Sequence, residues 1–436
     1  MKNRITTLMI VVALLMAGKM AKAQNGYNLP YSQFGVGMSL LNVPASNALG
    51  GVRLGQSSAN RINFFNPASY AAIEMESFVF DMGLTLEGFT QKDNEAKISD
   101  FDGYLSYVAI GFPLTKWWKM SAGLIPYSEV GYSSVHNENR PVEGTVKTSY
   151  DGSGSVIELY WGNGFNVTKN LSLGFNMNYL FGSIERAVTY DFVESDVNHF
   201  ADSRRQKSTT VSTLTFDFGA NYLWQIDEKR KLNIALTWQM PRKGKTHDTS
   251  WVYTLSEGNG SNIVVYPTTG DGSYTSTLEV PMKVGLGLDY EWEQKWKLAG
   301  DVEWSQWNGL KYIEGASNPV FAQKSVDYVK DVRVALGGGW TGDKESSNYW
   351  RRIGITGGVH YEHGKLGLDL NNGSQILDEY GVGMGFSFPM RKGRSMLTLS
   401  FSYSSFGNSD VLKTDCFVVG LSLGSCESWF VKRKYN

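Results

Sequence analysis

The chain has 436 residues, of which 42% are hydrophobic, 13% aromatic and only 19% charged, with 48 glycines against 11 prolines. This composition excludes a disordered, coiled-coil or collagen-like chain and favours a β-rich protein. The 41 basic and 42 acidic side chains nearly balance, so the chain lacks the strongly basic surface of nucleic-acid-binding proteins, and we expect no nucleic-acid partner.

The first 23 residues have the pattern of a secretory signal peptide. Lys2 and Arg4 precede an apolar run over residues 8–17, and Ala21-Lys22-Ala23 matches a small-residue cleavage site. The run is too short to span a bilayer as a helix. Residues 1–23 are therefore predicted to direct export and to be removed.

Residues 24–73 show no sustained strand alternation. They are rich in Gly, Asn, Ser and Pro, yet they also carry apolar residues such as Phe34, Leu41 and Phe64. The segment is either disordered or folded inside a barrel as a plug. Its apolar content favours the plug, because a free tail would leave these side chains in water.

Alternating apolar and polar residues then recur along the chain, which is the pattern of β-strands. In the clearest example, Phe78, Phe80, Met82, Leu84 and Leu86 alternate with polar or small residues. The alternation also places Tyr104 on the same face as Val108, Ile110 and Phe112. Fourteen strands are predicted, over residues 78–87, 104–112, 118–124, 157–165, 171–181, 214–224, 232–240, 278–288, 296–304, 332–336, 353–361, 380–388, 397–403 and 417–423.

The faces opposite the apolar ones carry Gly, Ser, Thr, Asn and charged residues. A soluble β-sandwich also alternates, but an even number of strands, polar opposite faces and terminal aromatic residues are typical of a transmembrane barrel. We therefore predict an all-β fold, a transmembrane antiparallel barrel of about fourteen strands over residues 74–430, with a basic tail over 431–436. Its place would be the outer membrane of a Gram-negative bacterium, with membrane lipid and the barrel-assembly machinery as partners.

Short and long connections are predicted to alternate. Short turns are expected at 115–116, 168–170, 227–230 and 391–393, and longer polar loops near 90–100, 134–152, 190–208, 243–273, 306–328 and 364–378. In outer-membrane barrels the short turns are periplasmic and the long loops extracellular. Phe430 is a candidate for the aromatic terminus of the last strand.

The segment Asn66-Pro67-Ala68, just before the first strand, resembles the signature of the FadL-type long-chain fatty-acid transporters. The layout of signal peptide, N-terminal hatch and fourteen strands is similar to that family, and in particular to FadL-like proteins of Bacteroidetes. The resemblance implies passive uptake of fatty acids or other hydrophobic compounds, with Asn66, Pro67 and Ala68 in the hatch. It also implies a lateral exit at a kinked third strand.

Gly123 and Pro126 are the candidate residues for that kink. Pro126 has no backbone N–H to donate to the sheet, so it belongs at a bulge or at a strand end, and Gly123 weakens a strand. As a different function, some FadL-like barrels act as anchors in type IX protein secretion, and the sequence alone does not separate this interaction role from transport.

No enzyme, cofactor or metal site is predicted. The chain has neither a Gly-x-Ser-x-Gly nucleophile elbow nor a phosphate-binding loop. His360 and His363 differ in strand parity, so they should point to opposite faces rather than share a metal. Charged residues on the strands are interpreted as lumen ion pairs; they are Glu185, Arg186, Asp217, Glu279, Lys283, Asp301, Glu303, Arg333 and Arg352. Cys416 and Cys426 are expected to be unpaired, although a turn between them would permit a disulfide.

Overall fold

The structure is a computed structural model that describes residues 42–428. Within this range the description omits residues 93–96, 142–143, 195–200, 256–263, 268–271, 307–311, 314–325, 329–330, 344–345, 365, 371–372, 377, 391–393 and 409–411. The predicted signal peptide, Phe430, the basic tail and the turn at 391–393 lie outside the described residues.

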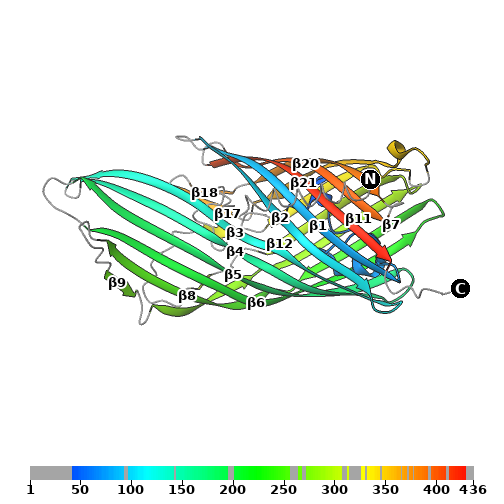
Figure 1. Ribbon diagram of the computed structural model, residues 1–436, viewed down its shortest axis with the longest axis horizontal. Coiled ribbons are helices and arrows are strands. Elements are labelled where there is room, and N and C mark those ends of the chain that lie inside the picture. Colours follow the sequence, from blue (N-terminus) through cyan, green and yellow to red (C-terminus); the bar gives the residue numbers. More distant parts are fainter. Residues whose placement is uncertain are drawn as a thin grey trace, which may run out of the picture.

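The fold is a closed antiparallel β-barrel of fourteen strands, as the alternation predicted (Figure 1). The wall begins with β1 (Ser77–Lys92) and β2 (Lys97–Pro113), of 16 and 17 residues. Four longer strands of 23 or 24 residues follow, namely β3 (Trp118–Arg140), β4 (Gly144–Asn166), β5 (Leu171–Glu194) and β6 (Asp202–Gln225). The wall continues through β7 (Arg230–Gln239), β11 (Met282–Trp292), β12 (Trp296–Gln306), β15 (Asp331–Trp340), β16 (Gly354–His363), β19 (Glu379–Met390), β20 (Ser395–Asn408) and β21 (Leu412–Ser428).

Pairing between β1 and β21 closes the ring, in register from Ser77 opposite Ser428 to Lys92 opposite Lys413. Closure gives the backbone groups of the first and last strands partners within the sheet, which a barrel in lipid requires. Short turns connect β2 to β3, β4 to β5 and β6 to β7 at the predicted positions. By the general rule for these barrels, that end faces the periplasm.

Two strands of the ring are interrupted by proline. β7 is continued by β8 (Arg242–Leu255) after Pro241, and β10 (Ser273–Val280) leads into β11 after Pro281. β8 and β10 pair with each other, and β7 and β11 likewise. The two prolines therefore interrupt neighbouring strands at one level, because neither can donate a ladder hydrogen bond.

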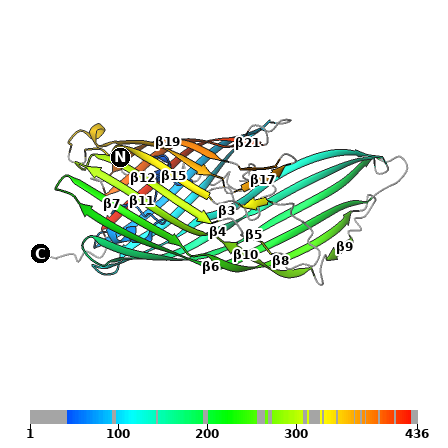
Figure 2. The ribbon, with the colours of Figure 1, turned by 180° about the vertical axis from the view of Figure 1, so that it is seen from behind.

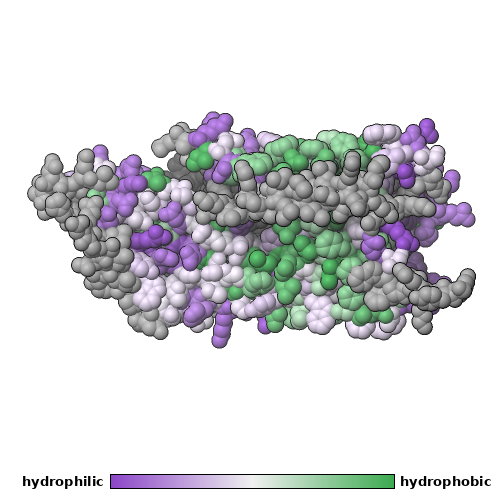
Figure 3. All heavy atoms as spheres, viewed as in Figure 1, coloured by the Kyte–Doolittle hydropathy of each residue, from purple (hydrophilic) through white to green (hydrophobic). Residues whose placement is uncertain are grey.

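The strands β3–β6 and β8 extend well beyond the rest of the ring (Figures 1 and 2). These extensions correct the prediction of polar loops near 134–152, 190–208 and 243–273, much of which is strand. The sequence there is rich in Ser and Thr and polar on both faces, so it lacks the apolar alternation by which strands in lipid are recognised. On the face drawn in Figure 3, purple and white atoms cover the described part of the extensions, whereas green, apolar atoms gather over the remaining barrel.

In the part of the wall with apolar alternation, apolar side chains face outward and polar side chains face inward, as predicted. Leu173, Leu236 and Leu336 on the outer face are 43%, 53% and 57% exposed, whereas Asn176 on the inner face is 1% exposed. Tyr104 is an exception to the predicted faces. A bulge at Ser106, where the register of β1 and β2 shifts, places Tyr104 on the inner face with Glu87 and puts Val108 outside.

The remaining elements are short. They are α2 (Pro44–Asn47), the 3₁₀ helices η3 (Pro67–Ala72) and η4 (Tyr349–Arg352), the strands β9 (Val264–Pro267) and β13 (Tyr312–Ile313), and a small separate sheet of β14 (Val326–Tyr328), β17 (Leu366–Leu370) and β18 (Gly373–Ile376). Among the helices that the structure describes, none has the length and apolar character needed to cross a membrane.

Candidate functional site

The segment from Asn42 to Ile73, here called the inner segment, contacts inward-facing residues around the barrel wall. Its Asn66 is fully buried and directly precedes η3 as the N-cap residue, where its side-chain Oδ1 accepts a hydrogen bond from the backbone N–H of Ala68. The Nδ2 group of Asn66 donates to the backbone oxygen of Leu54 at 3.0 Å and to Oδ1 of Asn221 on β6 at 2.7 Å. Asn66 thus caps a short helix and fastens it to the wall.

Glycines on the inner wall make room for this turn. Gly174 and Gly219 are direct cross-strand partners on β5 and β6. A Cβ added to Gly174 would lie 2.6 Å from the backbone nitrogen of Ala68, and one added to Gly219 would overlap Oδ1 of Asn66. Only glycine permits this approach, which explains part of the chain's high glycine content.

A second glycine row receives the start of the inner segment. Gly337, Gly358 and Gly383 lie side by side on β15, β16 and β19. Added Cβ atoms at Gly358 and Gly383 would overlap the backbone of residues 47–50. The inner segment is therefore seated on two glycine surfaces on different parts of the wall.

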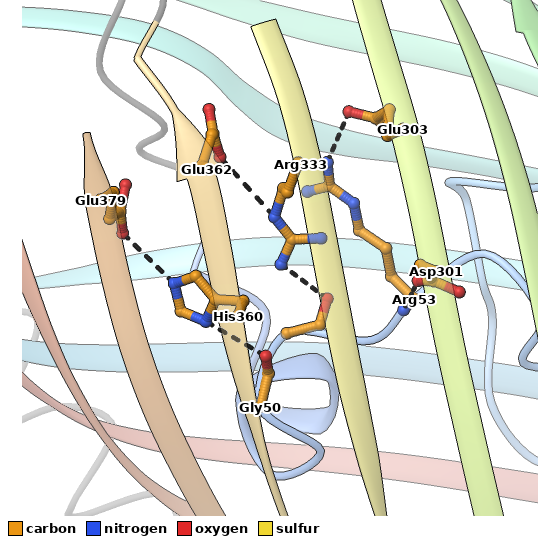
Figure 4. A network of polar contacts seen from close by, with 9 residues as sticks. Gly50, Arg53, Asp301, Glu303, Arg333, His360, Glu362 and Glu379 are labelled. Carbon is orange, nitrogen blue, oxygen red and sulfur yellow. Dashed lines mark hydrogen bonds and ion pairs between the residues drawn. The ribbon is translucent and has the colours of Figure 1, made fainter. Parts of the chain in front are cut away.

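Charged side chains hold the inner segment between these surfaces (Figure 4). Arg53 forms an ion pair of 2.8 Å with Glu303 on β12, and both side chains are largely buried. The backbone N–H groups of Arg53 and Leu54 donate to the carboxylate of Asp301, the latter at 2.8 Å. The Arg53 guanidinium also stacks 4.6 Å from the ring centre of Phe65.

The neighbouring strands continue the network. Glu303, Arg333, Glu362 and Glu379 are cross-strand partners in a single row over β12, β15, β16 and β19. Arg333 donates to the backbone oxygen of Gly51 at 2.8 Å and pairs with Glu362 at 3.6 Å. His360 lies between the backbone oxygen of Gly50, at 3.1 Å, and Glu379, at 3.4 Å (Figure 4).

A polar cavity of about 80 Å³ adjoins this row. Its lining includes Asn42, Glu87, Arg333, Glu362 and Glu379. A volume of that size has room for a few water molecules. Ligand pockets for drug-sized molecules are larger and mostly apolar, so this cavity does not suit a hydrocarbon chain.

A break in the wall lies between β2 and β3. Their described residues pair only from Val108–Pro113 to Lys119–Leu124, although β2 continues to pair with β1 and β3 with β4. Gly123 pairs with Ala109, and only the pair of Leu124 with Val108 follows before the break. A Cβ added to Gly123 would lie 2.7 Å from the ring of Tyr160. Pro126 lies just beyond, where the register of β3 and β4 shifts and Tyr127 is the extra residue of a bulge.

An aromatic cluster connects the break with the inner segment. Ile125, the first β3 residue beyond the pairing with β2, packs in one buried group with Phe64, Tyr107 and Tyr160. Tyr70 stacks on Tyr160 with ring centres 6.4 Å apart. The inner side of the wall next to the break is therefore apolar.

The structure brings the predicted residues into two places. Asn66, Pro67 and Ala68 form one turn against β4–β6, while Gly123 and Pro126 lie on β3 next to the break. Among the predicted ion-pair residues, Asp301, Glu303 and Arg333 bind the inner segment. Glu279 instead pairs with Lys243, and the guanidinium of Arg352 lies over the ring of Tyr349 in η4. Sequence reasoning missed Arg53, Glu362, Glu379 and the contact of His360, and strand parity alone could have placed the last three on the inner face.

His360, His363 and the two cysteines are accounted for by ordinary contacts. His363 pairs with Asp378 at 2.9 Å, on the face opposite His360. Cys416 and Cys426 are both free and buried, and the Cys416 thiol donates to Glu87. Within the described ranges, no group of three or more His, Cys, Asp or Glu side chains is arranged to hold a metal ion.

A closed fourteen-stranded antiparallel ring with an apolar outer face is the fold of a transmembrane β-barrel, and it is similar to that of the FadL-like barrels. Three solved structures have the same fold. The CymD monoaromatic hydrocarbon channel is 13% identical with a TM-score of 0.54, and the match covers 91% of this chain and 100% of CymD. The toluene transporter TbuX of Ralstonia pickettii is 11% identical with a TM-score of 0.56, and the match covers 89% of this chain and 98% of TbuX. A FadL homologue of Pseudomonas aeruginosa is 14% identical with a TM-score of 0.55, and the match covers 94% of this chain and 99% of the homologue.

At such identities the likeness concerns the fold. No curated protein matches the chain in sequence. The BamG family model matches residues 3–436, and the chain therefore belongs to the BamG family.

Proposed function

We propose that this protein is a passive outer-membrane channel for hydrophobic compounds, long-chain fatty acids among them, with residues 24–73 as its plug. Ligand would pass the plug and leave sideways into the membrane between β2 and β3. The observation that carries this proposal is the end of β2–β3 pairing at Leu124, next to the bulge at Pro126. A lateral path keeps an apolar ligand out of the aqueous periplasm, where exposure costs ~0.8 kcal/mol per CH₂.

Further support comes from the surroundings of the break. Its inner side carries the buried aromatic cluster with Ile125 and Tyr160. The solved structures of the same fold include proteins described as a toluene transporter and a monoaromatic hydrocarbon channel. The Asn66-Pro67-Ala68 turn, seated beside that cluster, would be the part of the plug that a ligand meets first.

The test removes the bulge. Deleting Tyr127 removes the extra residue between Pro126 and Ser128, so that regular pairing can run through β3. Replacing Pro126→Val restores a backbone N–H donor at the same place. Both variants should reduce uptake of radiolabelled fatty acid and toluene by cells carrying the protein, while heat-modifiable gel migration shows a folded barrel.

Pro389→Val is the matched control, because Pro389 lies in β19 within regular pairing with β20. It should leave uptake unchanged. Gly123 is not a suitable site for sealing, because a Cβ there meets the backbone of β2 and would widen the break. Folded bulge variants that take up both compounds at the wild-type rate would overturn the lateral path.

A second candidate function is an interaction role as a partner of the barrel-assembly machinery, to which the name of the BamG family points. One structural observation favours it. Beyond the break, β2 exposes Ile98 and Phe101 at 57% and 66%, beside a strand edge that β3 leaves unpaired. Unpaired edges and exposed apolar side chains are features by which sheets bind other chains.

Cross-linking in intact cells, followed by mild detergent extraction, distinguishes the two functions. If the protein is a partner in assembly, or an anchor in type IX secretion, the corresponding subunits should be captured, and Phe101→Asp should abolish their capture. Loss of the protein should then lower the amounts of other outer-membrane barrels or of secreted proteins. A pure channel predicts neither effect.

A further inference from the structure

Beyond the break, β2 and β3 each leave one edge without a described partner. From Lys97 to Tyr107, β2 pairs with β1 but, on its other side, with none of the residues that the structure describes. The facing part of β3, from Ile125 to Arg140, pairs in the same way with β4 alone. Figure 1 shows that β3 continues into the extension, whereas β2 ends before it. Backbone groups along such edges can pair with a further strand.

Asn42, where the inner segment begins, lies against the wall next to the free edge of β2. Its Nδ2 group donates to Oη of Tyr104 at 3.0 Å and to Glu87 at 3.2 Å. Its backbone oxygen accepts a hydrogen bond from Thr85, which is the cross-strand partner of Tyr104. The backbone of Asn42 therefore lies against β1, one strand spacing of ~4.8 Å from the unpaired edge of β2.

The stretch of chain before the inner segment repeats the sequence of a strand in the wall. Residues 34–40 read Phe-Gly-Val-Gly-Met-Ser-Leu, and residues 380–386 of β19 read Tyr-Gly-Val-Gly-Met-Gly-Phe. In β19, Val382 and Met384 are 50% and 46% exposed on the outer face. Gly383 faces the lumen, where an added Cβ would overlap the inner segment. Residues 34–40 therefore carry the pattern of a wall strand with apolar side chains outside and glycine inside.

We propose that residues 34–40 dock in the break as an additional strand beside β2. Between Tyr104 and the closed end of the break, the free edge has only residues 105–107, which are too few for this segment. The segment therefore runs along residues 97–103 toward Asn42, parallel to β2 and antiparallel to β3. These seven edge residues equal the segment in length.

The docked segment also covers apolar surface on β2. Ile98 and Phe101 are 57% and 66% exposed beside the free edge. Val36 and Met38 would stand next to them on the outer face and remove part of that surface from water. Docking closes the part of the wall through which the proposed channel would release its ligand. Only this last consequence rests on the proposed function, because docking is measured without ligand and can succeed or fail separately from uptake.

Hydrogen exchange of the full-length protein in detergent, followed by mass spectrometry, measures whether the edge is occupied. Deleting residues 34–40 should speed the exchange of amides in residues 97–103 by about tenfold, as expected when a hydrogen bond is lost. Val36→Asp, which puts a charge on the apolar face, should have the same effect in a chain of full length. Ser39→Asp is the matched control, because position 39 has the opposite parity and would face the lumen; its exchange should equal the wild type.

Cysteine cross-linking tests the placement directly. Met38→Cys combined with Phe101→Cys should give a disulfide-linked peptide under mild oxidation. Met38→Cys combined with Tyr150→Cys should not, because Tyr150 is 39% exposed on β4, whose neighbours occupy both of its edges. Equal exchange by the wild type and the deletion variant would overturn the proposal. Rapid exchange in both would mean an empty edge, and slow exchange in both would mean a different occupant, such as a strand of a partner protein.

Discussion

The side-chain amide of Asn66 donates a hydrogen bond of 2.7 Å to Oδ1 of Asn221, a residue 155 positions later on β6. The same amide group reaches Leu54, so one buried side chain joins two parts of the inner segment to the wall. Asn66 belongs to the turn that sequence alone singled out. Its side chain links the inner segment to β6, and a substitution at Asn66 tests this role.

Asn66→Ala should loosen the inner segment without opening the barrel. The substitution leaves Oδ1 of Asn221 and the carbonyl of Leu54 buried without this donor, which costs about 1–3 kcal/mol for each such group. We expect faster proteolysis of the inner segment in the purified protein and a larger ion conductance in planar bilayers. Conductance and proteolysis equal to the wild type would show that the hydrogen bond does not hold the segment.

A larger side chain at Gly174 should displace the Asn66-Pro67-Ala68 turn by steric overlap. Gly174→Val places a side chain where Ala68 and Pro67 lie, so the turn must move away from the wall. Gly88→Val on β1 is the control, because an added Cβ there meets only the ring of Phe101, at an ordinary 3.6 Å. Both barrels should assemble, but only Gly174→Val should become leaky to small polar solutes. Equal leakage by the two variants would contradict the assigned contact.

Breaking the Arg53–Glu303 ion pair should destabilise the inner segment more than replacing both partners. Glu303→Gln leaves the largely buried Arg53 guanidinium without this carboxylate partner, which lowers the stability of the folded protein by up to about 3 kcal/mol. The double variant Arg53→Met with Glu303→Gln removes the unpaired charge and should recover part of that loss. A double-mutant cycle on chemical unfolding measures the coupling, and strictly additive effects would show that the pair contributes nothing.

The two faces of one strand should respond differently to a positive charge. Leu236 on β7 is 53% exposed on the outer face, whereas Gln239 points inward next to Asp217. Arg at Leu236 should cost ~2–4 kcal/mol if it lies near the membrane midplane, and Arg at Gln239 much less. Urea unfolding in lipid vesicles gives both values. Asn176, although inward, is a poor control because it bonds to Phe64 and Tyr70.

Aromatic residues at the ends of the strands should mark the membrane boundary. Next to the turn after β11, the ring centre of Trp296 lies 6.3 Å from that of Trp292 and 5.2 Å from that of Trp340. Replacing Trp296→Phe should reduce fluorescence quenching by lipids brominated near the head group. Trp251→Phe, on the β8 extension, should not. Equal changes would place both residues at the same depth.

The sequence predicted the fourteen strands and their faces because lipid imposes an apolar outer face with a period of two. It mispredicted the extensions because water imposes no such pattern on residues such as those of β8. Tyr104 was misplaced for a different reason: a bulge inserts one residue and reverses parity, and nothing in the local pattern announces it.

The site was predictable only in part. Asn66, Pro67 and Ala68 stand out as a motif, but their seat on Gly174 and Gly219 depends on pairing between distant strands. The partnership of Arg53 with Glu303 joins residues 250 positions apart, which no local pattern reveals.

The seats of the inner segment also bear on the order of assembly. The segment leaves the exporting machinery among the first residues, yet Gly358 and Gly383 lie on strands made near the end of the chain. Contacts of such sequence separation form slowly, because a long loop must close before they stabilise anything. Until β16 and β19 are in place, the Asn47–Gly50 backbone has no surface to dock on. The inner segment can therefore dock completely only after most of the barrel wall has been made.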